Sequence, residues 1–569
     1  MNSEIAKILY EIAMLLDMKE VAFKPRAFEK AADVIGSLEE DVEDIYKRGG
    51  LKALMQISGI GQGIAEKIEE YIKTGDIKDY ERLKKQIPVD VGGLSSIEGL
   101  GPKNIYKLYK KLGIKTVEEL EEAAKTGKLK SLEGFGEKSE QKFLKGIEFS
   151  KKGQGRFVLG FVLPMIKSIL ERIKGLPYVE TAELAGSIRR MQETVGDLDI
   201  LVISKEPEKV MDYFVKIPEV VHVYGKGTTK TNVRLKNGMN ADLRVLESKS
   251  FGAALQYFTG DKYHNIAVRE IAVKMGYKLS EYGLFKGKKV IASKTEEEVY
   301  EKLGLEWIPP EIRTNSGEID AARDGKLPNL IEYGSLKGDL QVQTNWTDGQ
   351  NSIKEMAEAA KKAGLEYIVI TDHTKSLAMT GGQDERKILK QMAEIDKVQK
   401  EVKGIKILKG AEVNILKDGK MDITDEILSK LDVVGGAVHS NFNLTEEEQT
   451  QRIIKAMENP NVDIIFHPTG RVIQKREAYK VDMDELIKTA KRTKTILEID
   501  AYPSRLDLKD EYIRKAVQAG VKLSIDSDAH NTLHLQYLEM GIAQARRGWA
   551  QKNDIINTSN WQEMLRLLK

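Results

Sequence analysis

Seven short apolar runs recur between residues 338 and 530, and many of them end in residue types that bind metals. They are GDLQVQ, YIVITDH, IKILKGAEV, LDVVGGAVHS, VDIIFHP, TILEID and VKLSIDSDAH. Amphipathic helical patterns such as IKEMAEAAKKAGLE lie between several of the runs, which indicates repeated β–α units. Parallel strands of this kind close into a barrel whose chemistry lies at the carboxyl ends of the strands. The sequence therefore predicts a (β/α)7-type barrel over its last third.

The predicted rim of this barrel carries imidazole and carboxylate side chains. The chain has seven histidines and no cysteine, so any metal must be held by nitrogen and oxygen ligands. A single histidine at a strand end is usually packed or solvated, but a whole set on one rim indicates a metal centre. The candidate ligands are Asp348, His373, Glu412, His439, His467, Asp528 and His530.

A second acidic group lies upstream, in ELAGSIRRMQETVGDLDILVIS. Asp197 and Asp199 begin a strand-like run, and residues two apart on a strand project from the same face. Asp242 follows in a second strand pattern, GMNADLRVLE. An Asp-x-Asp alone is equally compatible with solvent-facing strand ends, but three converging carboxylates supply the oxygen ligands of a two-metal phosphoryl-transfer site. The turn at residues 186–190 (GSIRR) adds donors suited to a polyphosphate.

Three segments of the first 150 residues repeat a Gly-apolar-Gly turn before a helical run. They are ISGIGQGIAEKIEEYI at 57–72, IEGLGPKNIYKLYKKL at 97–112 and LEGFGEKSEQKFLKGI at 132–147. Such a turn leaves backbone N–H groups free to bind a phosphate without lysine or arginine. One copy could be an ordinary link between helices, but three in register indicate a sequence-independent contact with DNA backbone. The glycines concerned are Gly59, Gly61, Gly99, Gly101, Gly134 and Gly136.

Net charge distinguishes the segments, although the whole chain is close to neutral. Residues 151–310 carry 26 basic and 20 acidic side chains, whereas residues 1–150 and 311–569 each carry two more acidic than basic ones. A field that attracts nucleic acid is therefore expected in the middle third. No window approaches the run of about 18 apolar residues that a membrane span needs, and the N-terminus lacks a signal-peptide pattern. The sequence predicts a cytoplasmic protein without a membrane segment.

Together these patterns resemble the family X DNA polymerases, the polymerase beta group, in the bacterial and archaeal form fused to a PHP (polymerase and histidinol phosphatase) domain. The string G-S-x-R-R, G-D-x-D and a later Asp is similar to the nucleotidyltransferase superfamily, and LQYFTGDKYHNIAVR at 255–269 to the polymerase beta thumb. The Gly-x-Gly repeats resemble helix-hairpin-helix motifs.

The resemblance implies a multidomain fold: a helical N-terminal region, an α+β palm with a thumb, and the PHP barrel. A Pro- and Gly-containing polar stretch marks a linker before the barrel. The expected boundaries are 1–83 (8-kDa-like domain), 84–150 (fingers-like domain with two hairpins), 151–250 (nucleotidyltransferase palm), 251–315 (thumb), 316–335 (linker) and 336–569 (PHP phosphoesterase domain).

The resemblance also implies roles for residues of the polymerase site. Asp197, Asp199 and Asp242 would bind two Mg²⁺ or Mn²⁺, with Asp242 nearest the primer 3′-hydroxyl. Lys67 would form a Schiff base if the N-terminal domain has 5′-deoxyribose phosphate lyase activity, although an exposed helical lysine is usually only solvated. The residues that would contact the incoming nucleotide are Ser187, Arg190, Tyr257, Phe258, Gly260, Asn265 and Arg269.

For the barrel, the resemblance implies a Zn²⁺ or Mn²⁺ cluster and 3′–5′ exonuclease or phosphoesterase activity. Most members of the family begin the domain with His-x-His, whereas this chain has Gln341 and Gln343. An amide oxygen is a weaker donor than an imidazole nitrogen, so we expect one metal position to be weakened or empty and the nuclease to be reduced or absent. Arg471, after HPTG, is a candidate phosphate contact.

The leading prediction is a monomeric DNA-directed DNA polymerase that fills short gaps during base excision repair, with gapped or primed DNA and dNTPs as its partners. The alternative is a DNA phosphoesterase that acts through the barrel and uses the polymerase core as a DNA-binding platform. A third possibility, a DNA-end-binding scaffold with two vestigial centres, requires that the three aspartates do not converge. A template-independent nucleotidyltransferase would not explain the hairpins or the YFTG segment.

Overall fold

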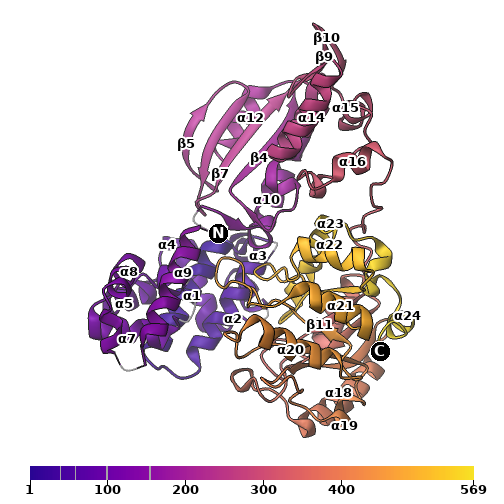
Figure 1. Ribbon diagram of the computed structural model, residues 1–569. Coiled ribbons are helices and arrows are strands. Elements are labelled where there is room, and N and C mark those ends of the chain that lie inside the picture. Colours follow the sequence, from indigo (N-terminus) through magenta and orange to yellow (C-terminus); the bar gives the residue numbers. More distant parts are fainter. Residues whose placement is uncertain (39, 58, 96, 98–99, 133, 153–154) are drawn as a thin grey trace. The chain divides into compact units, whose positions relative to one another are not determined.

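The computed structural model describes the chain except residues 39, 58, 96, 98–99, 133 and 153–154 (Figure 1). The chain divides into two compact units, residues 1–154 with 471–478, and residues 155–470 with 479–569. Among the described residues, no helix combines the length and the apolar character needed to cross a bilayer.

The first unit is helical, as predicted. Its helices share one apolar core, to which the long first helix contributes Ile5, Leu9 and Ile12 at the spacing of a single buried face. The elements are α1 (Asn2–Met18), α2 (Lys24–Ser37), α3 (Val42–Met55), α4 (Gln62–Thr74), α5 (Lys78–Gln86), α6 (Val91–Ser95), α7 (Pro102–Leu112), α8 (Val117–Lys125) and α9 (Glu137–Lys152).

The second unit begins with a five-stranded sheet in the order β2-β4-β7-β6-β5. Strands β4 and β7 are parallel, and the other neighbours are antiparallel. Along β6, Thr231, Val233 and Leu235 are buried while the residues between them face the other side. The elements of this region are β1 (Phe157–Val158), α10 (Leu159–Lys174), β2 (Val179–Leu184), α11 (Gly186–Arg189), β3 (Thr194–Val195), β4 (Asp197–Ser204), α12 (Pro207–Phe214), β5 (Val220–Lys226), β6 (Lys230–Leu235) and β7 (Asn240–Leu246).

Three helices and a small antiparallel sheet follow, and the segment expected as a linker contains a further helix, α16. Glu318 of α16 is fully buried, and its Oε1 lies 2.6 Å from Nδ1 of His264. Helix α16 therefore packs on the preceding region, whereas Ile331, later in the expected linker, donates its N–H to the Ala550 carbonyl of the barrel region. The elements are α13 (Phe251–Thr259), α14 (Lys262–Lys274), β8 (Lys278–Ser280), β9 (Gly283–Lys286), β10 (Lys289–Ala292), α15 (Glu296–Lys302) and α16 (Glu318–Arg323).

The seven predicted strands form one parallel sheet in sequence order, and this confirms the barrel prediction. The sheet nearly closes, because Val342 forms a bridge with Ala529 and the Asp526 carboxylate accepts the N–H of Leu340. The strands are β11 (Gly338–Val342), β12 (Tyr367–Ile370), β13 (Lys406–Asn414), β14 (Val433–Ala437), β15 (Ile464–Ile465), β16 (Ile496–Asp500) and β17 (Leu523–Asp526).

Helices cover the outside of the barrel and surround β11 in Figure 1. Their apolar faces form a core with the outward-facing strand residues, and a second core, with Leu340, Val369 and Phe466, fills the interior. The helices are α17 (Ile353–Lys362), α18 (Glu385–Glu401), α19 (Asp425–Leu428), α20 (Glu446–Met457), α21 (Met483–Thr493), α22 (Asp510–Ala519), α23 (Leu538–Arg547) and α24 (Trp561–Leu565).

The barrel interior has no room for a side chain at Gly435. A Cβ there would lie 1.9 Å from Cε2 of the Phe466 ring. We expect Gly435→Ala to lower the free energy of unfolding by about 1–3 kcal/mol, measured by urea unfolding, because the rigid ring must move. Gly436→Ala is the matched control, since its Cβ would meet only flexible side-chain ends at 3.3 Å or more. Equal stability of both variants would contradict this account.

Candidate functional site

The three predicted aspartates converge on one face of the palm sheet. Asp199 of β4 pairs in register with Asp242 of β7, and Asp197 pairs with Asn240. Their neighbours in the strands, such as Leu198 and Ala241, are buried on the opposite face. The alternation of the strand thus directs all three carboxylates away from the core.

Negative charge is concentrated at this site. Burial raises the pKa of Asp199 to about 6, and the charges of Asp197 and Asp242 act in the same direction. Asp242 accepts a hydrogen bond from the Asn232 amide, and its Oδ2 lies 3.5 Å from Nζ of Lys230. Clustered carboxylate oxygens with excess negative charge fit divalent cations such as Mg²⁺.

The turn before β4 touches this carboxylate cluster. Gly186 has a φ of +61°, and a Cβ on it would lie 2.5 Å from Oδ2 of Asp199. The glycine therefore lets the turn that carries Ser187 approach the acidic site.

The two adjacent arginines of this turn have different environments. Arg189 donates to both carboxylate oxygens of Glu296 at 2.8 Å and to Oγ1 of Thr259, so it serves the structure. Arg190 donates to the Thr259 carbonyl at 2.7 Å, while its buried Nε has no hydrogen-bond partner among the described residues. Arg190 therefore retains a donor for a ligand.

The YFTG segment ends α13, and the side chain of Asn265 holds it in shape. The Asn265 amide donates to the carbonyls of Tyr257 at 2.7 Å and Gly260 at 2.9 Å. Arg269 donates from Nε to the Asn265 carbonyl at 3.1 Å. The ring of Phe258 lies 4.7 Å from the guanidinium carbon of Arg244. The amide of Asn265 thus supports the turn instead of extending freely from it.

The Gly-x-Gly turns precede helices, as the repeat predicts. Gly59 and Gly134 have φ of +83° and +84°, a conformation that glycine adopts readily. A Cβ on Gly61, Gly101 or Gly136 would meet no atom within 4 Å among the described residues, so these backbones are open. Gly99 lies outside the described residues.

Lys67 lies on α4 within the same unit. Its amine is paired with the carboxylate of Asp79, and this contact lowers the pKa of Asp79.

The predicted barrel ligands form one connected cluster at the carboxyl ends of the strands. Glu412 is central: its Oε1 lies 2.9 Å from Nε2 of both His439 and His467, and its Oε2 lies 3.2 Å from Nδ1 of His373. His373, Glu412 and His439 offer three ligand atoms within 4.8 Å of one another. Burial alone would raise the pKa of Glu412, but the neighbouring imidazoles hold it well below its usual range.

A second group shares His373. Oδ2 of Asp348 lies 3.6 Å from Nε2 of His373 and 3.7 Å from Nε2 of His530. Asp528 adjoins this group, with its Oδ1 3.8 Å from Nδ1 of His530. The buried Oδ1 of Asp348 has no hydrogen-bond partner among the described residues, which fits a ligand atom. The two groups could hold two neighbouring ions.

One of the two glutamines that replace His-x-His contacts the same cluster. Gln343 donates from Nε2 to Oε2 of Glu412 at 2.8 Å. Its Oε1 and both polar atoms of Gln341 are buried without a hydrogen-bond partner in the described part of the chain. The Gln343 amide therefore occupies a lone pair that Glu412 would otherwise offer to a metal.

The structure adds two residues that sequence reasoning missed. Oδ1 of Asn414 lies 2.7 Å from Nδ1 of His439, so it orients that imidazole. Asn414 is two residues after Glu412 on β13, and this spacing was a usable signal. Nε of Arg505 lies 3.7 Å from Oδ2 of Asp528, and nothing in the sequence pattern indicates it. Arg471 belongs to the first unit, so its phosphate contact stays a prediction.

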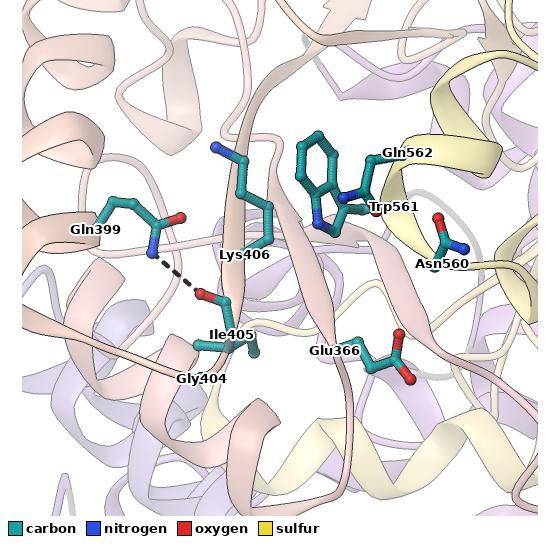
Figure 2. A pocket seen from close by; sticks show the side chains of 8 residues that line it. All are labelled: Glu366, Gln399, Gly404, Ile405, Lys406, Asn560, Trp561 and Gln562. Atoms are coloured by element: carbon teal, nitrogen blue, oxygen red, sulfur yellow. Dashed lines mark hydrogen bonds between the residues drawn. The ribbon is translucent and has the colours of Figure 1, made fainter.

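A pocket at the other end of the barrel is separate from this cluster (Figure 2). It contains Glu366 and Lys406, which stand at the starts of β12 and β13, and Trp561 of α24. The candidate ligands His373 and Glu412 stand toward the opposite ends of the same two strands. The hollow is therefore not the metal site.

Family models match four parts of the chain. They are a helix-hairpin-helix domain at residues 1–77, a SAM-like helix-hairpin-helix tandem at 91–148, a DNA polymerase beta thumb at 254–314 and a PHP domain at 339–559. Hairpins, a polymerase beta thumb beside an acidic palm, and a PHP barrel define a family X DNA polymerase with a C-terminal PHP domain.

The chain belongs to this family. It is 38% identical to the DNA polymerase/3′-5′ exonuclease PolX of Bacillus subtilis (strain 168), over 100% of this chain and 99% of the relative. It is also 30% identical to a probable phosphatase of Thermoanaerobacter sp. (strain X514), over 37% of this chain and 84% of that protein. A probable phosphatase of Caldanaerobacter subterraneus subsp. tengcongensis is 31% identical over 32% of this chain and 70% of the relative.

Gly186 should be essential to the acidic site. Gly186→Ala would force a left-handed residue, at about 1–2 kcal/mol, and would push a methyl group into the Asp199 carboxylate. We expect primer extension to fall at least about tenfold, since each 1.4 kcal/mol lost from the transition state is a factor of ten. Gly225→Ala, in the open strand β5, should extend primers normally. Normal extension by Gly186→Ala would show that the turn can move away from Asp199.

Proposed function

We propose that this chain is a DNA-directed DNA polymerase that fills short gaps during base excision repair and carries a PHP barrel with weakened 3′–5′ exonuclease or phosphoesterase activity. The observation that carries the polymerase assignment is the in-register pairing of Asp199 with Asp242, with Asp197 on the same face. The full-length similarity to a DNA polymerase/3′-5′ exonuclease supports DNA and dNTPs as the substrates.

Asp197, Asp199 and Asp242 would hold two Mg²⁺ or Mn²⁺. When bound, such ions stabilise the charge of the attacking and leaving oxygens. Catalysis otherwise depends on positioning the primer and the nucleotide in line.

The order of elements across the sheet supports one direction for the DNA. The turn with Ser187 and Arg190 follows β2 and contacts α13, so the triphosphate would lie toward β2 and β4. In-line attack requires the primer on the opposite side of the transferred phosphate, over β7 and β6. Lys230 and Arg234 project there from the same face as Asp242, and their charges suit a DNA backbone.

The remaining polymerase residues have supporting roles in this proposal. Ser187 and Arg190 would bind the triphosphate, Arg190 through the donor that the protein leaves unused. The turn of Tyr257, Phe258 and Gly260, supported by Asn265, would line the sugar, with Arg269 behind it.

The N-terminal unit would bind the DNA backbone through its open glycine turns, in agreement with the helix-hairpin-helix matches. Lys67 stays our candidate for lyase chemistry. The ion pair with Asp79 stabilises the charged form of the amine, so Lys67 would have to leave this partner and lose a proton before it attacks a sugar aldehyde.

A 5′-labelled primer on a template with a one-nucleotide gap tests the polymerase assignment. With Mg²⁺ or Mn²⁺ and dNTPs, the wild type should extend the primer. Asp242→Asn should reduce extension by about 100-fold or more, a typical loss for a group that stabilises developing charge. The variant should keep its melting temperature, because Asp242 is not buried in the core. Primer shortening without any extension would make the barrel the working centre and overturn the assignment.

The weakened barrel follows from Gln341 and Gln343. Two groups of ligand atoms fit Mn²⁺ or Zn²⁺. They are His373, Glu412 and His439, and Asp348, His373 and His530. A further position beside Glu412 lacks both imidazoles, and the Gln343 amide hydrogen-bonds its carboxylate.

Elemental analysis of the dialysed protein tests this second assignment. The wild type should retain fewer than three tightly bound ions per chain, and Gln341→His with Gln343→His should gain about one, because imidazole is the stronger donor. Gln562→His is the matched control at the exposed far end of the barrel and should gain none. Three tightly bound ions in the wild type would contradict the proposal.

A further inference from the structure

A helix of the barrel contacts the turn that we assign to the triphosphate. Arg547, the last residue of α23, donates from Nη1 to the carbonyl oxygen of Met191. Gln544, one turn earlier, donates from Nε2 to Oε1 of Glu193 at 2.9 Å, and Nη2 of Arg547 lies 3.4 Å from the same oxygen. Residues 191–193 directly follow Arg190 in the sequence.

Met191 closes the turn that presents Ser187 and Arg190. The N–H of Met191 donates to the Ile188 carbonyl at 2.9 Å, and the N–H of Gln192 donates to the Ser187 carbonyl at 3.1 Å. Met191 has a φ of +49°, a conformation that a residue with a side chain adopts only when its surroundings hold it. Arg547 binds the carbonyl of this strained residue.

The barrel holds Arg547 and Gln544 firmly. Nε2 of Gln544 also lies 2.9 Å from the Leu508 carbonyl and 3.2 Å from the Leu506 carbonyl. Nε of Arg547 lies 3.3 Å from Oδ2 of Asp510. Gln544 is 0% exposed and Arg547 is 6% exposed. A buried arginine with fixed partners on both sides can hold the Met191 carbonyl in place, whereas a mobile surface ion pair cannot.

We propose that Arg547, together with Gln544, is a positioning residue of the polymerase site. The PHP barrel would hold the Gly186–Glu193 turn in the conformation that binds the nucleotide triphosphate, so the barrel takes part in synthesis whether or not it hydrolyses DNA. The inference rests on the proposed role of Ser187 and Arg190, and neither Arg547 nor Gln544 touches the nucleotide.

Steady-state gap filling by the full-length chain tests the inference. Arg547→Ala should raise the KM for the dNTP about tenfold, the equivalent of roughly 1.4 kcal/mol of binding free energy, with a much smaller change in kcat. Arg547→Lys should recover part of the loss, because a single amine can still donate to the Met191 carbonyl. The metal content of the barrel should stay at the wild-type value, whereas the melting temperature of Arg547→Ala should fall, because the substitution removes a buried arginine from its partners.

Glu539→Ala is the matched control. Glu539 lies on the same helix and pairs with Lys167 of α10 at 2.6 Å, but both side chains are about half exposed and remote from the turn. This variant should leave the KM unchanged, because exposed pairs contribute little. A KM shift of equal size in Glu539→Ala would show that any loss of contact between barrel and palm has this effect. That result would overturn the inference.

Gln544→Leu keeps the test decisive if Arg547→Ala does not fold. It removes the hydrogen bond from the side-chain amide to Glu193 with little change in side-chain volume, and it should also raise the KM for the dNTP. A wild-type KM in a folded Arg547 or Gln544 variant would overturn the inference. Failure of the wild type to extend the primer would instead remove the proposed function on which the inference rests.

Discussion

The proposed polymerase site depends on the parallel pairing of β4 with β7. Their register sets Asp199 opposite Asp242, and a slip of one residue would turn Asp242 toward the helix-covered face. The same pairing brings like charges together, and burial then raises the pKa of Asp199. The fold therefore clusters carboxylates, and divalent cations would complement their charge. The left-handed Gly186 brings the adjoining turn into the same small space.

The two centres use different donor chemistry. The palm offers carboxylate oxygens only, which suit Mg²⁺, whereas the barrel mixes imidazoles with carboxylates and suits Zn²⁺ or Mn²⁺. In the barrel, His373 belongs to both ligand groups, so a change at this residue would affect both. Gln343 acts differently from a missing ligand, because its amide hydrogen-bonds Glu412 and competes with a metal.

The barrel and the polymerase core are joined by polar contacts as well as by the chain. Arg546 donates to Glu311 at 2.7 Å, and Arg514 donates to the Ser316 carbonyl at 2.5 Å. Glu318 is buried against His264, in the helix that also carries Asn265. These contacts lie within the compact unit formed by residues 155–470 and 479–569.

The sequence by itself determined the seven barrel strands and indicated the acidic trio and most of the candidate metal ligands, because strand periodicity and ligand type are local properties. Tertiary structure decided how these residues are used. Arg189 and Arg190 are identical neighbours, yet only Arg189 meets Glu296, 107 positions away. The bond from Gln343 to Glu412 and the reach of Arg547 to Met191 also join distant segments. Such contacts depend on which strands and helices become neighbours on folding. The local periodicity of the sequence does not indicate these neighbours.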